Sequence, residues 1–408
     1  MLVVITRARK DAKAVEHAIQ EEVLSLGGSR SVENLDLSSL KNKIPIFIFG
    51  KEDKKLAEDI EKEISKITPI YKIVILNKKS VRNARLSEII SAFETAKAEL
   101  RLSFNFKNKT FTFTNSPQVI KNIHPDYDAY FILGKEFVKN TKEVFGIEVK
   151  EGNLILRKHL NEEEIYTPGL KAIIRKTIGK KPKVVKHYPE VKSEEIDLKK
   201  LVEANKNWLL KLEETAIVFL KENIGEGEEI GVPFSGGKDS TAVLILAKKA
   251  FKNVKALYVK VSHEFPYTEE YVKYVCEKLD AELVKTEAKF DVEKFGLPTH
   301  ENRWCTAVKL QALERIATPV LIVGDREAES RARRRRKEKQ TRVHKELYPI
   351  KYWSGAMVQL YVLLNEIPLH PLYYTGFYRL GCTICPSLSE WEHHLLKKVS
   401  LVKTEKFL

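Results

Sequence analysis

Residues 230–247 read Ile230-Gly231-Val232-Pro233-Phe234, then Ser235-Gly236-Gly237-Lys238-Asp239-Ser240, then Thr241-Ala242-Val243-Leu244-Ile245-Leu246-Ala247. The first run predicts the end of a buried strand, and the last run predicts an apolar helix. Two glycines at the junction let backbone N–H groups approach an anion without obstruction by a Cβ atom. The start of the helix adds unpaired donors and the positive end of its dipole. The sequence therefore predicts a loop that holds phosphate.

This loop differs from a Walker A element, which requires G-x-x-x-x-G-K-[ST]. Lys238 is followed by Asp239 instead of Ser or Thr. The run Ser235–Ser240 resembles the S-G-G-x-D-S signature of the PP-loop pyrophosphatases, which implies cleavage of ATP between its α and β phosphates. Ser235, Ser240 and Lys238 would supply further donors and charge. The alternative is a glycine-rich turn that only joins the strand to the helix.

The chain is strongly basic, with 71 Lys and Arg against 56 Asp and Glu and a formal net charge of +15 over 408 residues. The segment Arg331–Arg342 alone holds eight basic residues and one acid, Glu338. A run this basic attracts polyanions such as nucleotide phosphates or an RNA backbone, and a solvated loop is the alternative. The charge therefore predicts a polyanionic partner, with tRNA or another RNA as a candidate, while the resemblance of Ser235–Ser240 implies an adenine nucleotide as a partner.

The length predicts two or three domains. Apolar runs are strand-sized and shorter than the roughly 20 residues needed to cross a bilayer. The start, Met1–Arg7, has a short apolar run followed by charge, which is too short for the core of a signal peptide. We expect a cytoplasmic protein with no membrane partner, and the sequence leaves its oligomeric state open.

The chain divides into four parts by pattern. Alternating strand and helix signals in residues 1–114 predict a small α/β domain. Short strands and turn signals in residues 115–178 predict a mixed or β-rich accessory module, and the polar residues 179–194 predict a linker. Renewed alternation in residues 195–408 predicts an α/β catalytic domain with a doubly wound parallel sheet, which binds ligands at the carboxyl ends of its strands.

The apolar pattern sets the expected bounds of three elements in particular. The apolar pattern predicts a helix over Asp11–Leu26 in the first part and a short strand over Ile147–Val149 in the second. It also predicts a helix over Leu201–Glu222 that precedes the strand leading to the phosphate loop.

Further motifs follow the phosphate loop in a fixed order between residues 228 and 390. They are His263-Glu264-Phe265-Pro266-Tyr267-Thr268, Arg303-Trp304-Cys305-Thr306 with Lys309, Gly324–Arg333, Pro349-Ile350 with Trp353, Leu372-Tyr373 with Gly376, and Gly381-Cys382-Thr383-Ile384-Cys385-Pro386. Together they resemble the PAPS (phosphoadenylyl sulfate) reductase family of PP-loop proteins, with Thr306 in place of the second cysteine of R-x-C-C. The resemblance implies that the nucleotide-binding residues are Ser235, Gly236, Gly237, Lys238, Asp239, Ser240, His263, Phe265, Arg326, Glu329, Ser330 and Arg333.

Several charged residues of these motifs suit a nucleotide site on chemical grounds. Arg326, Arg333 and Lys309 can neutralise phosphate or sulfate charge, and Glu329 can hold a neighbouring arginine. Asp239 can help hold Mg²⁺ on the phosphates. For any one of them a surface salt bridge is the alternative. The predicted catalytic residues are Lys238, Asp239, Lys309 and Arg326.

The four cysteines are too few for a secreted disulfide framework. Cys276 lies in a predicted helix and is expected to be a small buried residue. Cys382-x-x-Cys385 presents two thiolates on one turn, which suits iron–sulfur, zinc or redox chemistry. The resemblance implies a [4Fe–4S] cluster with three ligands, Cys305, Cys382 and Cys385. The alternatives are no metal and a zinc site completed by His300, His370 or His393.

The family's reductases carry a nucleophilic cysteine in a C-terminal E-C-G-x-H tail, and no cysteine follows Cys385 in this sequence. This departure favours ATP-dependent, adenylating sulfur transfer, with tRNA as a candidate acceptor and a sulfide or thiol donor protein as the source. The implied cofactors are ATP or APS/PAPS, Mg²⁺ and the cluster. The alternatives are an APS or PAPS reductase that releases sulfite, and a non-catalytic nucleotide- or RNA-binding protein.

Overall fold

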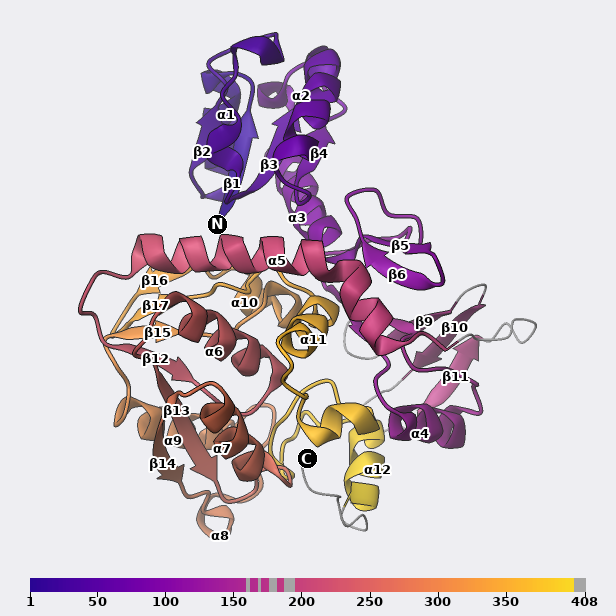
Figure 1. Ribbon diagram of the computed structural model, residues 1–408, viewed down its shortest axis with the longest axis vertical. Coiled ribbons are helices and arrows are strands. Elements are labelled where there is room, and N and C mark those ends of the chain that lie inside the picture. Colours follow the sequence, from indigo (N-terminus) through magenta and orange to yellow (C-terminus); the bar gives the residue numbers. More distant parts are fainter. Residues whose placement is uncertain (159–161, 168–169, 176–181, 187–194, 400–408) are drawn as a thin grey trace. The chain divides into compact units, whose positions relative to one another are not determined.

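A computed structural model describes residues 1–158, 162–167, 170–175, 182–186 and 195–399 (Figure 1). The chain forms two compact units, one of Met1–Tyr127 with Ala204–Glu222 and one of Asp128–Glu203 with Asn223–Leu408. None of the helices within the described ranges has both the length and the apolar character needed to cross a membrane.

The first unit is built on a four-stranded parallel sheet with the order β2-β1-β3-β4. The strands are β1 (Leu2–Thr6), β2 (Val23–Ser25), β3 (Ile44–Phe49) and β4 (Lys72–Ile75). The helices between and after them are α1 (Arg9–Ile19), α2 (Lys54–Ile67) and α3 (Leu86–Leu102). Strand β3 is buried along its whole length and packs its phenylalanines against the apolar stripe of α2. The α/β class predicted for this part of the chain is confirmed.

A hairpin of β5 (Phe104–Lys107) and β6 (Thr110–Phe113) completes this unit, together with most of the helix α5 (Leu198–Asn223). The Asn205 amide of α5 bonds the backbone of β6, accepting from Phe113 N at 2.8 Å and donating to Phe111 O at 2.9 Å. The helix predicted over Leu201–Glu222 is therefore present and three residues longer at its start.

The helix predicted over Asp11–Leu26 is wrong at its C-terminal end. Helix α1 stops at Ile19, because Gln20 takes a left-handed conformation (φ 58°) and its N–H bonds Glu16 O. The chain then turns, and Val23 and Leu24 pair with β1 as the strand β2. The apolar residues that extended the helical pattern belong to this strand.

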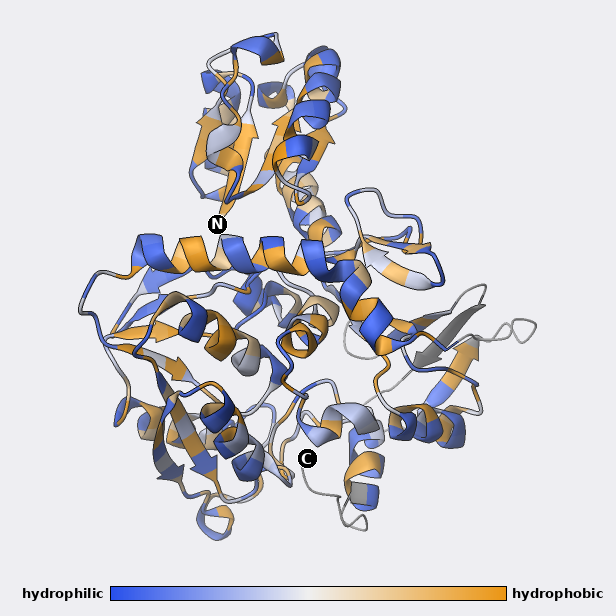
Figure 2. Ribbon diagram, in the orientation of Figure 1, coloured by the Kyte–Doolittle hydropathy of each residue, from blue (hydrophilic) through white to orange (hydrophobic). Residues whose placement is uncertain are grey.

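The second unit holds a six-stranded sheet with the order β14-β13-β12-β15-β17-β16. Its strands are β12 (Ile230–Pro233), β13 (Lys255–Val261), β14 (Glu282–Ala288), β15 (Val320–Ile322), β16 (Lys339–Thr341) and β17 (Lys345–Leu347). All neighbours pair in parallel except β16 with β17. The central strands β12 and β15 are apolar, as expected for strands covered on both faces (Figure 2). The predicted parallel sheet is confirmed, with one antiparallel edge strand.

The order of the strands makes this sheet doubly wound. The helices around it are α6 (Lys238–Ala250), α7 (Thr268–Lys278), α8 (Val292–Phe295), α9 (Trp304–Glu314), α10 (Arg331–Arg334), α11 (Gly355–Leu364) and α12 (Glu390–Val399). The chain runs from β12 outward to β14 and then returns through α9 to β15, on the other side of β12. Because such crossovers are right-handed, α9 lies on the face opposite α6 and α7. The reversal between β12 and β15 is the position at which open α/β sheets bind ligands.

A second sheet of the same unit has the order β11-β10-β9-β8-β7. Its strands are β7 (Tyr127–Phe131), β8 (Leu154–Lys158), β9 (Glu162–Thr167), β10 (Leu170–Arg175) and β11 (Lys183–Lys186), and helix α4 (Lys135–Phe145) follows β7. Its residues share an aromatic core with the C-terminal segment, in which Phe137 and Phe145 pack against Trp391.

The structure differs from two of the predictions made for this region. The segment predicted as the strand Ile147–Val149 has no regular structure, although both side chains are buried in the shared core. Of the predicted linker, Lys183–Lys186 forms the strand β11, while 179–181 and 187–194 lie outside the described residues.

Gly355 at the start of α11 has no room for a side chain. An added Cβ would overlap the ring of Tyr130, with Cδ1 and Cζ at 2.6 Å. We expect Gly355→Ala to lower the free energy of unfolding by about 1–3 kcal/mol, the usual cost of overpacking a core. Urea unfolding measures this change. Gly225→Ala, whose Cβ would meet Glu228 at 3.5 Å, is the control, and equal midpoints for the two variants would contradict this packing.

Candidate functional site

The predicted phosphate loop lies between β12 and α6, at the carboxyl end of a central strand. Gly236 has a φ of +70°, in the left-handed region, and a Cβ there would lie 3.3 Å from both Tyr271 and Val272. The fold of the loop itself therefore requires glycine at this position. The Ser240 hydroxyl ties the loop together, because it donates to Gly237 O at 2.9 Å and accepts from Ser235 N at 3.3 Å.

Gly237 is not required by the fold of the loop. Its backbone angles (φ −73°, ψ 149°) suit any residue, and a Cβ would make ordinary contacts, 3.4 Å from Ser235 Oγ and 3.9 Å from Ser240 Oγ. The missing side chain leaves space beside two hydroxyls and the N-terminus of α6. The Lys238 N–H at this N-terminus donates to the Tyr373 hydroxyl at 2.9 Å, and a helix N-terminus beside such a space suits a phosphate.

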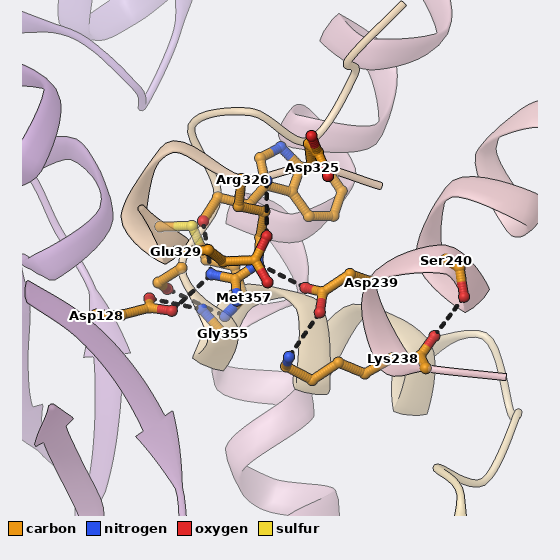
Figure 3. A network of polar contacts seen from close by, with 12 residues as sticks. Asp128, Lys238, Asp239, Ser240, Asp325, Arg326, Glu329, Gly355 and Met357 are labelled. Atoms are coloured by element: carbon orange, nitrogen blue, oxygen red, sulfur yellow. Dashed lines mark hydrogen bonds and ion pairs between the residues drawn. The ribbon is translucent and has the colours of Figure 1, made fainter. Parts of the chain in front are cut away.

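Lys238, Asp239 and Arg326 form a buried ionic network (Figure 3). Lys238 Nζ contacts Asp239 Oδ2 at 2.7 Å, and Arg326 Nε contacts Asp239 Oδ1 at 2.5 Å. Arg326 Nη1 also pairs with Asp128 Oδ2 at 2.7 Å, and Lys238 Nζ donates to Tyr378 O at 3.0 Å. The Arg326 side chain is 0% exposed and that of Lys238 is 1% exposed. Both cations are therefore enclosed by protein partners.

The network sets the charge state of its members. Burial alone raises the pKa of Asp239, but Arg326 and Lys238 outweigh it and bring that pKa to about 2. Burial likewise raises the pKa of Asp128, and Arg326 again outweighs it, so that the pKa falls below its ordinary value. Burial lowers the pKa of Lys238, while Asp239 opposes this effect. Each carboxylate stays ionised because a buried cation faces it.

The structure surrounds Lys238 and Arg326, two of the predicted site residues, with protein partners. The sequence predicted that both cations contact phosphate, but neither lines the cavity beside the loop, and both are paired inside the protein. Both oxygens of Asp239, which the sequence predicted to help hold Mg²⁺, bond cations in this structure. A Mg²⁺ ion would have to compete with Lys238 and Arg326 for that carboxylate. These contacts tie Arg326 to Asp239, in the first turn of α6.

A cavity of about 450 Å³ opens beside the loop, at the carboxyl ends of β12 and β13. One side is apolar, with Leu257, Val259, Phe265 and Phe290 among its residues. The polar residues on its wall include Ser235, Arg303, Lys309, Arg333 and Arg379. The three candidate sulfur-site cysteines line the same cavity, namely Cys305, Cys382 and Cys385. Ser235 of the loop, cations and thiols thus surround one space.

Arg333 is held on the cavity wall by two acids. Its Nε contacts Asp325 Oδ1 at 3.1 Å, and its Nη1 pairs with Glu329. Glu329 thus holds an arginine, as its sequence position suggested. Ser330 does not line the cavity, and its hydroxyl accepts from Arg333 N at 3.2 Å as the cap of α10. The cap fixes the short turn that presents Arg333.

The predicted adenosine-side element is fastened to the cysteine turn through its backbone. His263 O accepts from Thr383 N at 2.8 Å, and Phe265 N donates to Gly381 O at 3.2 Å. The Phe265 ring lines the cavity, whereas the His263 side chain does not. His263 therefore supports the turn that carries Cys382.

The cysteines share the cavity without forming a metal site. Burial raises the pKa of Cys382 to about 11, with Lys309 opposing the shift. Across the ranges that the structure describes, no three His, Cys, Asp or Glu side chains are grouped to hold a metal ion. His370, one candidate to complete a zinc site, is buried, and its Nδ1 accepts from Leu372 N at 3.3 Å. The residues present do not fit a cluster or zinc as arranged here.

Sequence reasoning missed four residues that shape the site. Asp128 and Tyr130 reach Arg326 from β7, Tyr373 accepts from Lys238 N at 2.9 Å through its hydroxyl, and Tyr378 O accepts from Lys238 Nζ. A signal was present for Asp128, because an acid followed by the apolar run 129–133 needs a buried partner. Tyr373 stood in the Leu372-Tyr373 motif without an assigned role, whereas Tyr130 and Tyr378 carried no such signal.

Residues 229–388 match the family model described as the phosphoadenosine phosphosulfate reductase domain. This match confirms the resemblance drawn from the motifs, and it identifies this part of the chain as a PAPS reductase-type PP-loop domain.

Curated relatives match somewhat less than half of the chain. Uncharacterized protein MJ0066 of Methanocaldococcus jannaschii is 31% identical over 214 residues, which are 48% of this chain and 45% of the relative. Sulfate adenylyltransferase subunit 2 of Streptomyces lavendulae is 27% identical over 218 residues, which are 44% of this chain and 68% of that protein. The chain spans about half the length of the M. jannaschii protein.

Among solved structures, PAPS reductase from Candida auris in a phosphate complex has 18% identity and a TM-score of 0.36, covering 43% of this chain and 95% of that one. The U34-tRNA thiolase NcsA from Methanococcus maripaludis with its [4Fe-4S] cluster has 15% identity and a TM-score of 0.35, covering 52% and 79%. Identities and TM-scores this low support no conclusion about the chemistry of this chain.

His370 predicts a dependence of stability on pH. Burial lowers its pKa to about 3, against an ordinary value near 6.5, so the unfolded chain binds the proton first as the pH falls. This contribution to stability is complete above the unfolded pKa and is lost as the pH falls from 6.5 toward 3. We expect a loss of about 1.5 kcal/mol between pH 6.5 and 5 that His370→Gln removes. Urea unfolding at both pH values measures it, and an equal loss in both proteins would contradict the assignment.

Proposed function

We propose that this protein is an enzyme that binds an adenine nucleotide at the phosphate loop and transfers sulfur to an acceptor that it first adenylates. One observation carries this proposal. The exposed Ser235 of the phosphate loop lines, at the carboxyl ends of β12 and β13, a cavity whose wall also holds cations and three thiols. The PAPS reductase-type domain and the related sulfate adenylyltransferase subunit support nucleotide chemistry at this place.

The protein groups have distinct roles in this proposal. The loop N–H groups and the Ser235 hydroxyl bind the β and γ phosphates. Lys309 and Arg333 on the cavity wall neutralise the charge that builds on the leaving pyrophosphate, where fixed cations stabilise a transition state most. Phe265 and the apolar wall contact the adenosine. Lys238 and Arg326 remain in the buried network and keep the loop in position.

The chemistry then needs two substitutions. An acceptor oxygen attacks the α phosphorus, a new O–P bond forms, and the bond to pyrophosphate breaks. A hydrosulfide from a donor then attacks the activated carbon, a C–S bond forms, and AMP leaves with the original oxygen. The cavity cysteines lie where such a sulfur would enter. No step runs through an iron–sulfur cluster, because the described thiols do not form a metal-binding group.

The basic segment Arg331–Arg342 supports an anionic acceptor such as tRNA or another RNA. It starts beside the cavity, since Arg333 lines the wall, and Arg335, Lys337 and Arg342 are exposed. A nucleic acid bound along these side chains would release counterions, so its affinity would fall steeply with salt. We therefore infer that the acceptor is an RNA.

The three thiols also favour a second candidate, reduction of APS or PAPS. A thiolate of the cavity would attack the sulfur of the bound nucleotide, form a thiosulfonate and release AMP or its 3′-phosphate. A second thiolate would attack the cysteine sulfur of that thiosulfonate, release sulfite and leave a disulfide. Cys382 and Cys385 lie on one turn, where Cys385 N bonds Cys382 O at 3.1 Å.

Turnover separates the two candidates. The full-length protein is incubated with Mg²⁺ and ATP, APS or PAPS, in the presence of RNA, sulfide or a dithiol as required. Pyrophosphate release that depends on ATP and RNA supports sulfur transfer. Sulfite release from APS or PAPS would establish the reductase and overturn the leading proposal.

Gly237→Ala tests the phosphate loop directly. The substitution fits the free protein, so the unfolding midpoint should stay close to that of wild type. The added methyl group would occupy the space beside Ser235 and Ser240, so we expect at least a tenfold loss of ATP affinity by calorimetry. Gly225→Ala, before β12 at the opposite end of the sheet, should leave the affinity unchanged. Equal affinities for all three proteins would place the nucleotide elsewhere.

A further inference from the structure

We infer that Asp128 is a positioning residue of the nucleotide site, which acts through Arg326 to hold Asp239 and the phosphate loop in place. Asp128 lies on β7, outside the matched residues 229–388. This inference rests on the proposed function for the identity of the ligand. It assigns a role in the site to the second sheet of the unit, which lies outside the domain match.

The Asp128 carboxylate is fixed on both of its oxygens. Oδ1 accepts from Gly355 N at 2.9 Å and from its neighbour Ala129 N at 2.9 Å. Oδ2 pairs with Arg326 Nη1 at 2.7 Å. The side chain is buried, so this pairing is not screened by water.

Arg326 links the position of Asp128 to that of Asp239, which follows the phosphate loop. Its guanidinium is planar, and its donors point in fixed directions. One edge is held by Asp128 and by the Tyr130 hydroxyl at 3.2 Å, so Nε points at Asp239 Oδ1. Gly324, two residues before Arg326, lies close to the start of α6. An added Cβ there would lie 3.0 Å from the Asp239 carbonyl. A shift of Arg326 therefore reaches the first turn of α6.

Among the four side chains that pair directly, the charges balance only with Asp128. Two cations, Lys238 and Arg326, face two carboxylates, Asp128 and Asp239. Without the Asp128 charge, the buried group would carry an uncompensated positive charge, which is costly in a protein interior. Arg326 would then be drawn toward Asp239 or toward water, and the loop would lose its fixed partner.

The same sheet holds the loop from a second side. The Tyr378 hydroxyl donates to Glu163 Oε2 of β9 at 2.8 Å, and the Arg157 guanidinium of β8 lies 4.4 Å from the centre of its ring. Tyr378 O in turn accepts from Lys238 Nζ at 3.0 Å. Strands β7, β8 and β9 thus constrain both Asp239 and Lys238.

Asp128→Asn tests the role of the charge with little change in shape. The amide oxygen can still accept from Gly355 N, while the ion pair to Arg326 is lost. We expect at least a tenfold loss of affinity for ATP, measured by calorimetry on the full-length protein under conditions where it is fully folded. Glu148→Gln is the matched control, because Glu148 is an exposed acid of the same region paired with Lys142, and it should bind as wild type does.

A double variant separates positioning from a purely structural role. Asp128→Asn with Arg326→Gln removes both charges and leaves Lys238 and Asp239 as a balanced pair. Removing both partners of a buried pair costs less than removing one, so we expect stability to recover relative to Asp128→Asn. Affinity for ATP should stay low, because nothing then holds Asp239. Recovery of affinity together with stability would overturn the inference, as would wild-type affinity in Asp128→Asn.

Hydrogen exchange without nucleotide keeps the inference testable apart from the proposed function. In Asp128→Asn we expect at least tenfold faster exchange of the Lys238–Ser240 amides, with no change in β14, which makes no contact with the network. Unchanged exchange in the loop would overturn the inference. Loss of loop protection in a protein whose wild type binds no adenine nucleotide would uphold the positioning role and refute the proposed function alone.

Discussion

The arrangement of the site depends on the burial of the Arg326 guanidinium between two carboxylates. A charged group that is 0% exposed persists only if its partners are close and fixed. Asp128 meets this requirement from strand β7 and Asp239 from the first turn of helix α6, and Tyr130 and Trp353 O bond the remaining donors at 3.2 and 3.4 Å. The phosphate loop, the segment after β15 and the strand β7 are therefore held together by one ionic group.

This constraint divides the cations of the site into two groups. Lys238 and Arg326 are neutralised by carboxylates and add little net charge at the loop. Lys309 and Arg333 stand on the cavity wall, where a ligand reaches them. The backbone contacts between His263 and Thr383 place the cysteine turn on the same cavity. Nucleotide and sulfur chemistry can then share one space without a rearrangement of the fold.

Local patterns predicted the parallel sheets and the loop, because buried strands and the Gly236-Gly237 junction leave short-range signals. They also predicted that Cys305, Cys382 and Cys385 belong together, since the motif order carried that information. The roles of Lys238 and Arg326 could not be predicted, because their burial depends on Asp128, which is nearly 200 positions from Arg326 along the chain. The end of α1 was missed for a local reason, the left-handed Gln20, which no glycine marks.

A crystal structure of the full-length protein with ATP bound would test the central claim most directly. The account predicts phosphate oxygens beside Gly237 and the Ser235 hydroxyl, contacts from Lys309 and Arg333, and an Arg326 that still pairs with Asp128 and Asp239. Phosphates bound away from this loop, or an Arg326 that leaves both carboxylates to contact them, would contradict it.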